Sequence, residues 1–404
     1  YNSFTFKSMI TFKEAFQKVL DHPLDLGIEI VSLMDSLNRI LAEDIYADRD
    51  FPPFNRATKD GIAVQFSDLV NTEHNFFIEG EAPAGVEQQV LCSKRHCLEV
   101  MTGAVVPENC DTVIMYEHIS IENGIATLNK EVTKGQNIHY QGSDEKLGAL
   151  LLSKGTKITP AEIGVMATVG KAMVKVKSNP KVCTIATGNE LVEVNTLPQP
   201  HQIRKSNMLT IEAALFNASI KASTLHLLDD KDNIKHKLES ALKENDVLLL
   251  SGGVSKGKFD FIPEVMESLG VEKVFHRVAQ RPGKPFWFGI HPKLKTVIFS
   301  FPGNPVSTFA NYHLYFLPWL HTSWGILIDK SYIKLFVAFT ITQPLTRFIQ
   351  VSTIVKDGII WAVPVNENGS GDLTSLTKAD GFICLEPRED IYEVGESVPF
   401  IKTR

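Results

Sequence analysis

The chain has 404 residues, of which 44% are hydrophobic and 22% charged, a composition typical of a folded protein with roughly two to four domains. A formal net charge of -6 argues against a general nucleic-acid binder, because such proteins carry excess positive charge. The most aromatic stretch, residues 312–328, contains Pro318 and two histidines and is too short to cross a bilayer.

The cysteines are odd in number and scattered, with no Cys-x-x-Cys pair among Cys92, Cys97, Cys110, Cys183 and Cys384. Such a set indicates reduced thiols, which favours a cytoplasmic protein over a secreted one. No secretory signal is visible, and residues 1–8 receive no predicted role.

Short elements separated by turns are predicted in the first part of the chain. Residues 12–20 have the spacing of an amphipathic helix, and the Asp60-Gly61 step within 51–64 is interpreted as a hairpin turn. Alternating apolar residues then predict a small β domain, with strands at 76–79, 97–101, 112–116 and 125–129. Thr102 follows the second of these strands, where a turn residue is the default interpretation and an oxyanion ligand is the alternative.

Strands and helices alternate in the middle of the chain, after a predicted helix at 159–170, a strand at 173–176 and a domain boundary at 178–180. The predicted strands are 182–186, 222–228, 246–250, 273–278 and 296–301, and the predicted helices are 208–216, 233–242 and 306–317. This alternation predicts a parallel α/β domain with helices on both faces. Ligands of such domains bind at the carboxyl ends of the strands.

The stretch after predicted strand 246–250 has the pattern of an anion site. Ser251, Gly252 and Gly253 break the strand, and a helical pattern begins near Asp260. Glycines let the backbone approach a phosphate closely, with free N–H groups pointing at it. An ordinary strand-to-helix turn is the alternative, and these residues alone leave both interpretations open.

Charged side chains also follow other strands of this domain or their connecting loops. Glu190, Asp229 and Asp260 carry the oxygen ligands that Mg²⁺ prefers, which makes them candidate metal ligands. Lys284 and the amides of residues 252–255 are suited to an anion. Taken singly, each carboxylate is equally well read as a helix cap or a turn residue.

The last part of the chain returns to a β pattern. Strands are predicted at 335–341, 348–355 and 359–363, with a hairpin turn at Asp357-Gly358 and a loop at 368–372. These elements predict a small barrel or sandwich.

Seven short motifs occur in a fixed order along the chain. They are residues 53–64, 101–104, 111–114, 187–191, 251–255, 281–285 and 302–307. Together they resemble, over essentially the whole chain from Met9, the molybdopterin molybdenumtransferase family of molybdenum cofactor biosynthesis, which is related to the C-terminal part of gephyrin. The chain departs from the family's usual pattern at Ala57, Lys59, Ile62, Glu99, Arg281 and Gln350.

The resemblance implies a multidomain α/β plus β fold with four parts. An elongated N-terminal segment would comprise residues 9–50 and 141–178, with an inserted β domain at 51–140. A molybdopterin-binding α/β domain would follow at 179–328, and a C-terminal β-barrel at 329–404.

The resemblance also implies a reaction and a set of site residues. Molybdate and adenylylated molybdopterin would react in a magnesium-dependent step, with entry of the metal into the dithiolene and release of AMP. The implied catalytic residues are Asp60, Thr102, Asp229, Asp260 and Lys284. The implied substrate-binding residues are Asp144, Ser251, Gly252, Gly253, Ser255, Gly283, Pro302, Gly303, Asn304 and Ser370, and the implied Mg²⁺ ligands are Glu190, Asp229 and Asp260.

Two other functions fit parts of this pattern. A molybdopterin adenylyltransferase would share the α/β domain, although it would lack the 53–64 motif and the C-terminal β segment. A non-catalytic scaffold, a role that gephyrin also has, is disfavoured by the presence of Asp260 and Lys284. For the enzyme, the family implies a homodimer with sites shared between subunits, transient contact with the adenylyltransferase, and no nucleic-acid or membrane partner.

Overall fold

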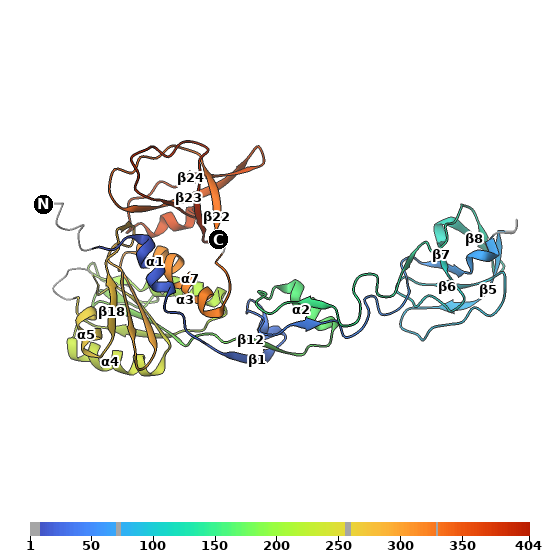
Figure 1. Ribbon diagram of the computed structural model, residues 1–404, viewed down its shortest axis with the longest axis horizontal. Coiled ribbons are helices and arrows are strands. Elements are labelled where there is room, and N and C mark those ends of the chain that lie inside the picture. Colours follow the sequence, from blue (N-terminus) through green and yellow to red (C-terminus); the bar gives the residue numbers. More distant parts are fainter. Residues whose placement is uncertain (1–8, 70–73, 255–259, 329) are drawn as a thin grey trace. The chain divides into compact units, whose positions relative to one another are not determined.

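The computed structural model describes residues 9–69, 74–254, 260–328 and 330–404 (Figure 1). The chain forms two compact units. The main unit contains the residues up to Val31, Asp35–Ala42 and Lys175–Arg404, and the inserted unit contains Ser32–Met34 and Glu43–Val174. Each unit contains at least one six-stranded sheet.

A six-stranded sheet forms the centre of the inserted unit, in the order β7-β4-β6-β5-β9-β8. Its strands are β4 (Gly61–Val64), β5 (Asn75–Ala82), β6 (His96–Val100), β7 (Thr112–Met115), β8 (Ile119–Glu122) and β9 (Ile125–Leu128). Alternate apolar side chains such as Ile62, Phe76 and Ile114 pack in its core. The predicted small β domain is therefore confirmed.

The predicted hairpin at Asp60-Gly61 is wrong. The turn joins β3 (Arg56–Ala57) to β4, but β3 pairs with β10 (Ile138–His139) and β4 pairs with β6 and β7. Prolines and a tight turn mark where a chain reverses or bends, but the choice of partner strand depends on residues distant in sequence.

The inserted unit also contains a short helix and a second small sheet. Helix α2 (Pro160–Thr168) begins after Thr159, which forms a capping box with Glu162, as the sequence predicts. Strand β2 (Ile45–Tyr46) pairs with β11 (Leu150–Leu152). The remaining short elements are the 3₁₀ turns Phe66–Leu69 and Tyr116–His118.

The α/β part of the main unit contains a six-stranded sheet in the order β16-β13-β17-β21-β20-β18. Its strands are β13 (Val182–Thr187), β16 (Ser223–Leu227), β17 (Val247–Ser251), β18 (Glu272–His276), β20 (Trp287–His291) and β21 (Thr296–Phe301). Strand β20, which the sequence analysis did not predict, runs antiparallel to both of its neighbours. The sheet is therefore mixed, with a parallel core of four strands, β16, β13, β17 and β21.

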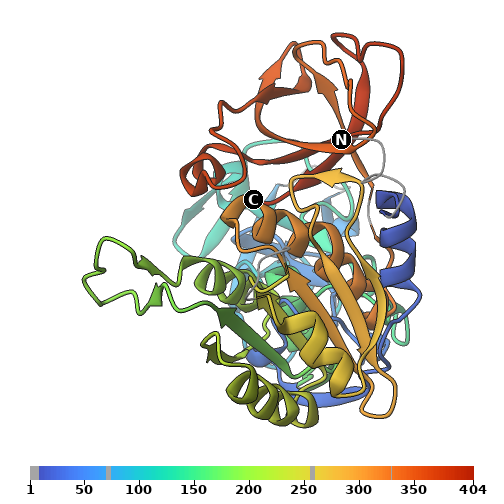
Figure 2. The ribbon, with the colours of Figure 1, turned by 90° about the vertical axis from the view of Figure 1, so that its left-hand side faces the viewer.

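Helices cover both faces of this sheet, as predicted. One face packs against α4 (Lys231–Glu244) and α5 (Ile262–Ser268) through residues such as Leu238 and Met266. The other packs against α1 (Phe12–Leu20), α3 (Ser206–Asn217), α6 (Pro305–Asn311) and α7 (Leu317–Trp324), with a π-helical turn at Tyr312–Phe316. Between β13 and α3, strands β14 (Leu191–Val192) and β15 (Ile203–Arg204) form an arm beside the sheet (Figure 2).

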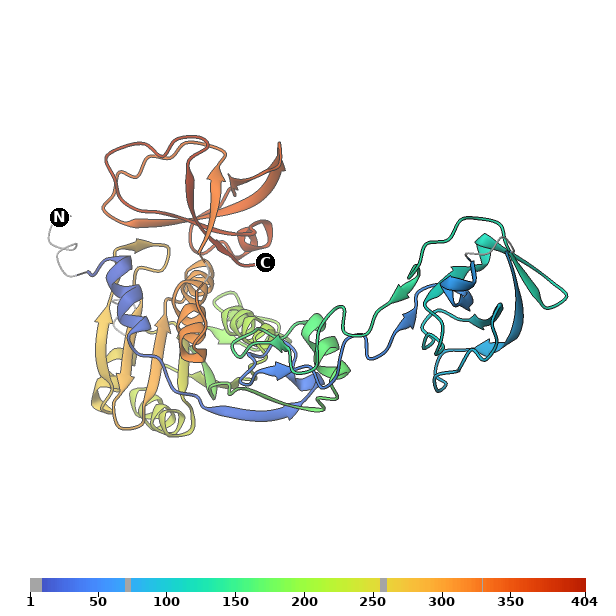
Figure 3. The ribbon, with the colours of Figure 1, turned by 45° about the vertical axis from the view of Figure 1, so that its right-hand side comes forward.

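The C-terminal part of the main unit is a closed β-barrel, drawn in orange and red in Figure 3. Strand β23 pairs with both β24 and β25, which closes a ring in the order β23-β24-β22-β26-β25. The strands are β22 (Ser331–Leu335), β23 (Thr346–Lys356), β24 (Ile359–Pro364), β25 (Gly381–Leu385) and β26 (Ser397–Lys402). The short strand β19 (Gln280–Arg281) extends the sheet beside β23.

One predicted strand of the barrel is misplaced. The sequence analysis assigned 335–341, whereas β22 ends at Leu335 and a bend follows. The hairpin at Asp357-Gly358 is confirmed, since both residues have positive φ and join β23 to β24.

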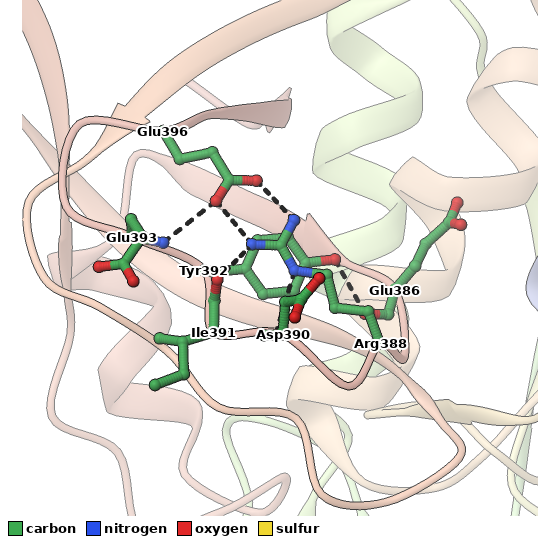
Figure 4. A network of polar contacts seen from close by, with 7 residues as sticks. All are labelled: Glu386, Arg388, Asp390, Ile391, Tyr392, Glu393 and Glu396. Carbon is green, nitrogen blue, oxygen red and sulfur yellow. Dashed lines mark hydrogen bonds and ion pairs between the residues drawn. The ribbon is translucent and has the colours of Figure 1, made fainter.

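Arg388 holds together a loop of the barrel between β25 and β26 (Figure 4). Its guanidinium lies 3.4 Å from the ring centroid of Tyr392, donates to both carboxylate oxygens of Glu396 at 2.7 and 2.6 Å, and donates to the carbonyls of Asp390 and Ile391. These hydrogen bonds lower the pKa of Glu396. Because the folded-state pKa of Glu396 is lowered, its pair with Arg388 stabilises the loop at pH values above the ordinary pKa of a glutamate. This stabilisation is lost as the pH falls through the lowered pKa.

Two properties of the described chain concern its environment. None of the helices among the described residues is both long and apolar enough to cross a membrane. All five cysteines are free thiols, and burial raises the pKa of Cys97, Cys110 and Cys384 to about 12.

Candidate functional site

A cavity of about 440 Å³ lies at the carboxyl ends of β13, β17 and β21 in the main unit. Eight of the predicted site residues line it: Glu190, Asp229, Ser251, Gly252, Gly253, Asp260, Gly303 and Asn304. Parallel strands end at the same edge of a sheet, so loops distant in sequence meet there. Predicted residue Ser255 lies outside the described residues.

Glycine is required where β17 ends. Gly252 and Gly253 have φ values of +95° and +71°, which L side chains rarely adopt. A Cβ on Gly252 would also lie 2.6 Å from Thr187 Oγ1. The backbone of this loop therefore faces the cavity without side chains, which suits close approach to an anion.

The carboxylates of the cavity come from three different loops. Glu190 follows β13, Asp229 follows β16, and Asp260 precedes α5. Asp229 is not the cap of α4, because the neighbouring Asp230 accepts from Asn233 N at 2.7 Å and is the N-cap. Helix α5 has Phe261 as its N-cap, without a side-chain cap hydrogen bond, and Asp260 directly precedes that residue.

The grouping of these carboxylates bears on whether they can hold a metal. Among the described residues, no three His, Cys, Asp or Glu side chains lie close enough together to hold a metal ion. The donors are nevertheless hard oxygens around one cavity, and Mg²⁺ is usually held by one or two carboxylates plus water and substrate phosphates. The residues thus fit a metal that arrives with a phosphate ligand, not a preformed metal site.

The residues of the predicted basic loop are not among the described residues that line this cavity. Gly283 has a φ of +88°, and Asn311 Nδ2 donates to its carbonyl at 3.3 Å. Gln280 Nε2 donates to Asn311 Oδ1 at 2.9 Å, which fixes the buried base of the loop that carries Lys284. Lys284 and Gly283 are therefore held in place, and neither lines the cavity among the described residues.

Two arginines meet beside this loop. Arg281 on β19 is the register partner of Arg347 on β23. Burial, and then the nearby charge of Arg281, lowers the pKa of Arg347. Two guanidiniums thus lie on neighbouring strands, and the carboxylate of Glu367 acts on Arg347 in the opposite sense to Arg281.

The predicted residues after β21 contact the barrel. Thr308 Oγ1 donates to the carbonyl of Pro302 at 2.6 Å, which closes the first turn of α6. Asn304 Nδ2 donates to Ser370 Oγ at 2.9 Å, and Val306 N donates to the carbonyl of Ser370 at 3.1 Å. Ser370 is thereby placed next to the cavity-lining loop.

The other predicted residues form a separate group in the inserted unit. Asp60 accepts hydrogen bonds from Thr102 N at 2.6 Å and Thr102 Oγ1 at 2.8 Å, which lower its pKa. Asp144 pairs with His139 Nε2 at 2.8 Å, and Arg56 contacts the other ring nitrogen at 3.1 Å. An arginine can only donate, so His139 Nδ1 accepts and its Nε2–H donates to Asp144.

Most departures from the family pattern have a local explanation. Ala57 and Ile62 are buried in the inserted unit, and Glu99 accepts from Tyr116 Oη at 2.8 Å. Gln350 is 1% exposed and bonds to Ser375 and Glu367, so it acts in the barrel core. Lys59 is exposed and has no such explanation.

Sequence reasoning missed one side of the cavity. It is lined by Ile203, Arg204, Lys205, Ser206, Asn207 and Met208, from β15 and the start of α3. The analysis began this helix at Met208. The available signal was Ser206, a residue type that favours helix starts, placed after two basic residues.

Three protein-family models match nearly the whole chain. "MoeA N-terminal region (domain I and II)" matches residues 10–170, and "Probable molybdopterin binding domain" matches residues 183–322. "MoeA C-terminal region (domain IV)" matches residues 333–403.

Curated relatives match over the same length. A Synechocystis protein named molybdopterin molybdenumtransferase is 37% identical over 97% of this chain and 99% of its own length. A Bacillus subtilis protein of the same name is 33% identical over 98% of this chain and 95% of its own length.

Solved structures agree with these matches. A molybdopterin biosynthesis MoeA protein from Pyrococcus horikoshii OT3 has a TM-score of 0.79 and 27% identity, covering 98% of this chain and 100% of that one. A second structure under a similar title has a TM-score of 0.77 and 31% identity. The family resemblance seen in the motifs is therefore confirmed.

Proposed function

This chain belongs to the MoeA family of molybdopterin molybdenumtransferases, and from that premise we propose that it inserts molybdate into adenylylated molybdopterin with release of AMP. The observation that supports this most strongly is that the relationship covers the α/β unit, the inserted unit and the barrel together. An adenylyltransferase would need only the α/β part.

The cavity residues suit the phosphate part of such a substrate. Gly252 and Gly253 expose backbone where a side chain would block an anion, and Ser251 and Asn304 place polar atoms beside them. Molybdate, the second anionic substrate, would be drawn by the positive charges of Lys284, Arg281 and Arg347 at the edge of the same unit.

We propose that Glu190, Asp229 and Asp260 hold Mg²⁺ when substrate is bound. The ion would supply Lewis-acid polarisation of the phosphoanhydride and neutralise charge on the leaving AMP. The carboxylates themselves would orient water and substrate oxygens, and in the absence of a cation they would repel the phosphates.

The first prediction concerns Asp260. We expect Asp260→Asn to fold normally, because the amide has the same size and asparagine caps a helix as well as aspartate does. The half-saturating Mg²⁺ concentration for AMP release should rise at least about tenfold, because an amide is a poorer ligand for a hard cation. A magnesium titration under saturating substrate measures this.

Asp230→Asn is the matched control, since Asp230 caps α4 with Asn233 and does not line the cavity among the described residues. It should lower stability slightly and leave the magnesium titration unchanged. An Asp260→Asn titration that overlays the wild-type curve would remove Asp260 from the ligand set.

A second prediction separates the insertase from an adenylyltransferase. Given ATP and molybdopterin that is not adenylylated, the protein should consume no ATP and form no adenylylated product. Coupled detection of pyrophosphate measures this, with a molybdopterin adenylyltransferase as positive control. Pyrophosphate formation at the rate of that control would support the alternative function.

The working unit that we propose is a cytoplasmic homodimer with shared sites, in transient contact with the adenylyltransferase that supplies its substrate. The candidate residues fall into two groups, one in the inserted unit with Asp60 and Thr102 and one in the main unit around the cavity. A two-fold dimer can bring the first group of one subunit to the second group of its partner, twice.

A further inference from the structure

Asn207, in the first turn of α3, touches two other segments that line the cavity. Its Nδ2 lies 3.0 Å from Ser251 Oγ at the end of β17 and 2.7 Å from the Gly303 carbonyl after β21. A longer contact of 3.4 Å reaches Thr308 Oγ1 in α6. One carboxamide thus ties α3 to the ends of two central strands.

The orientation of this carboxamide is fixed by its neighbours. The Gly303 carbonyl can only accept, so the atom facing it must be the amide nitrogen. The two N–H groups go to Gly303 and Ser251, while Thr308 Oγ1 donates its own hydrogen to the carbonyl of Pro302 at 2.6 Å. Oδ1 must therefore point away from these partners.

The carboxamide oxygen of Asn207 is left without a partner. It is buried and has no hydrogen-bond partner among the described residues. An unpaired buried acceptor costs free energy, and native proteins contain few of them. The fold keeps the three contacts of Nδ2 although Oδ1 is left unpaired. We infer that the role of Asn207 lies in its Nδ2 contacts.

We propose that Asn207 is a positioning residue that sets the spacing of the Ser251–Gly253 backbone and the Gly303 loop around the phosphate groups of the substrate. This rests on the proposed function of the cavity. Asn207 Nδ2 acts as a cross-link, because it holds the Ser251 hydroxyl and the Gly303 carbonyl at a fixed separation. Both loops are then already ordered when an anion binds.

The chain offers a matched control in Asn179. Its Nδ2 donates to the Ser219 carbonyl at 2.7 Å, and its Oδ1 is also buried without a partner among the described residues. Asn179 precedes β13, at the amino edge of the sheet, whereas the cavity is at the carboxyl edge. Asn207→Ala loses three contacts at the cavity, whereas Asn179→Ala loses one contact at the opposite edge of the sheet. The control thus shows whether the loss of a half-buried carboxamide away from the cavity affects binding.

The test measures binding and loop order separately. Binding of adenylylated molybdopterin, by equilibrium dialysis without molybdate, should weaken about tenfold or more in Asn207→Ala and change by less than about twofold in Asn179→Ala. Asn207→Asp should bind more weakly still, because a carboxylate would face the Gly303 carbonyl with no hydrogen to donate. Hydrogen exchange of residues 247–253 and 301–308 should quicken in Asn207→Ala alone.

Each outcome decides a different point. If the wild type binds the substrate, and Asn207→Ala has the same affinity and the same rate of hydrogen exchange, the positioning role is overturned. Lack of binding by the wild type would reject the proposed function. The hydrogen-exchange rates would still show whether Asn207 orders the two loops. If Asn207→Ala does not fold, Asn207→Asp, which keeps the size of the side chain and loses both Nδ2 hydrogens, is measured in its place. Exchange and affinity like the wild type in that variant would reject the inference.

Discussion

Two inactive variants, Asp60→Ala and Asp260→Ala, are expected to regain activity when their subunits are mixed in one dimer. Shared sites give a mixed dimer one site with both lesions and one with neither. About half of the wild-type activity per mixed dimer should therefore return, because one of two sites is intact. The measurement is AMP release after the dimers are dissociated and reassociated, with subunit exchange confirmed by native mass spectrometry.

The expected recovery depends on where Asp60 and Asp260 lie. Asp60 is held by Thr102 in the inserted unit, and Asp260 lines the cavity of the main unit. Each substitution removes one carboxylate and leaves the other unit's group intact. If each site lay within a single chain, every site in the mixture would keep one lesion, and no activity would return.

The reciprocal mixture is the control. A subunit with both substitutions, mixed with wild type, should give mixed dimers with no activity under shared sites, because each site then receives one lesion. The same dimers would keep about half of the activity if sites lay within single chains. Recovery in the reciprocal mixture, with none in the first, would reject shared sites, and a monomer in sedimentation at micromolar concentration would reject the dimer.

Local signals in the sequence were sufficient for many elements. Helix α1 has the predicted bounds because its apolar spacing coincides with a capping box between Thr11 and Glu14. Strand β21, at Thr296–Phe301, was also predicted to the residue, since a buried strand is a continuous apolar run. Both depend on neighbours in sequence.

Local sequence signals did not predict which strands pair with each other. Strand β20 is short and runs antiparallel between β21 and β18, and its apolar residues follow directly on the Arg281–Phe286 loop with no turn residue between them. Asp60-Gly61 was interpreted as a hairpin because turn chemistry is local. Strand β4 instead pairs with strands distant in sequence, as in Ala63 with Leu98 and Gly61 with Met115. The direction of a strand and its partner depend on tertiary contacts.

The candidate site was predictable to the extent that it follows strand ends. Glu190, Asp229 and Ser251 end or follow parallel strands, so the α/β pattern places them at one edge. Asn207 was not predictable, because its part depends on contacts with Ser251 and Gly303 made across the sheet edge. Lys284 was predicted from its motif and is not among the described residues that line the cavity.

We propose that this protein couples the release of AMP to the insertion of molybdate. The most direct measurement is single-turnover AMP formation from adenylylated molybdopterin, with molybdate and Mg²⁺ each supplied or withheld. We predict one AMP per site when both are present and a rate lower by at least about a hundredfold when molybdate is left out, because cleavage without metal insertion would waste the activated substrate. AMP release at the same rate without molybdate would contradict the assignment of this protein as a molybdenum insertase.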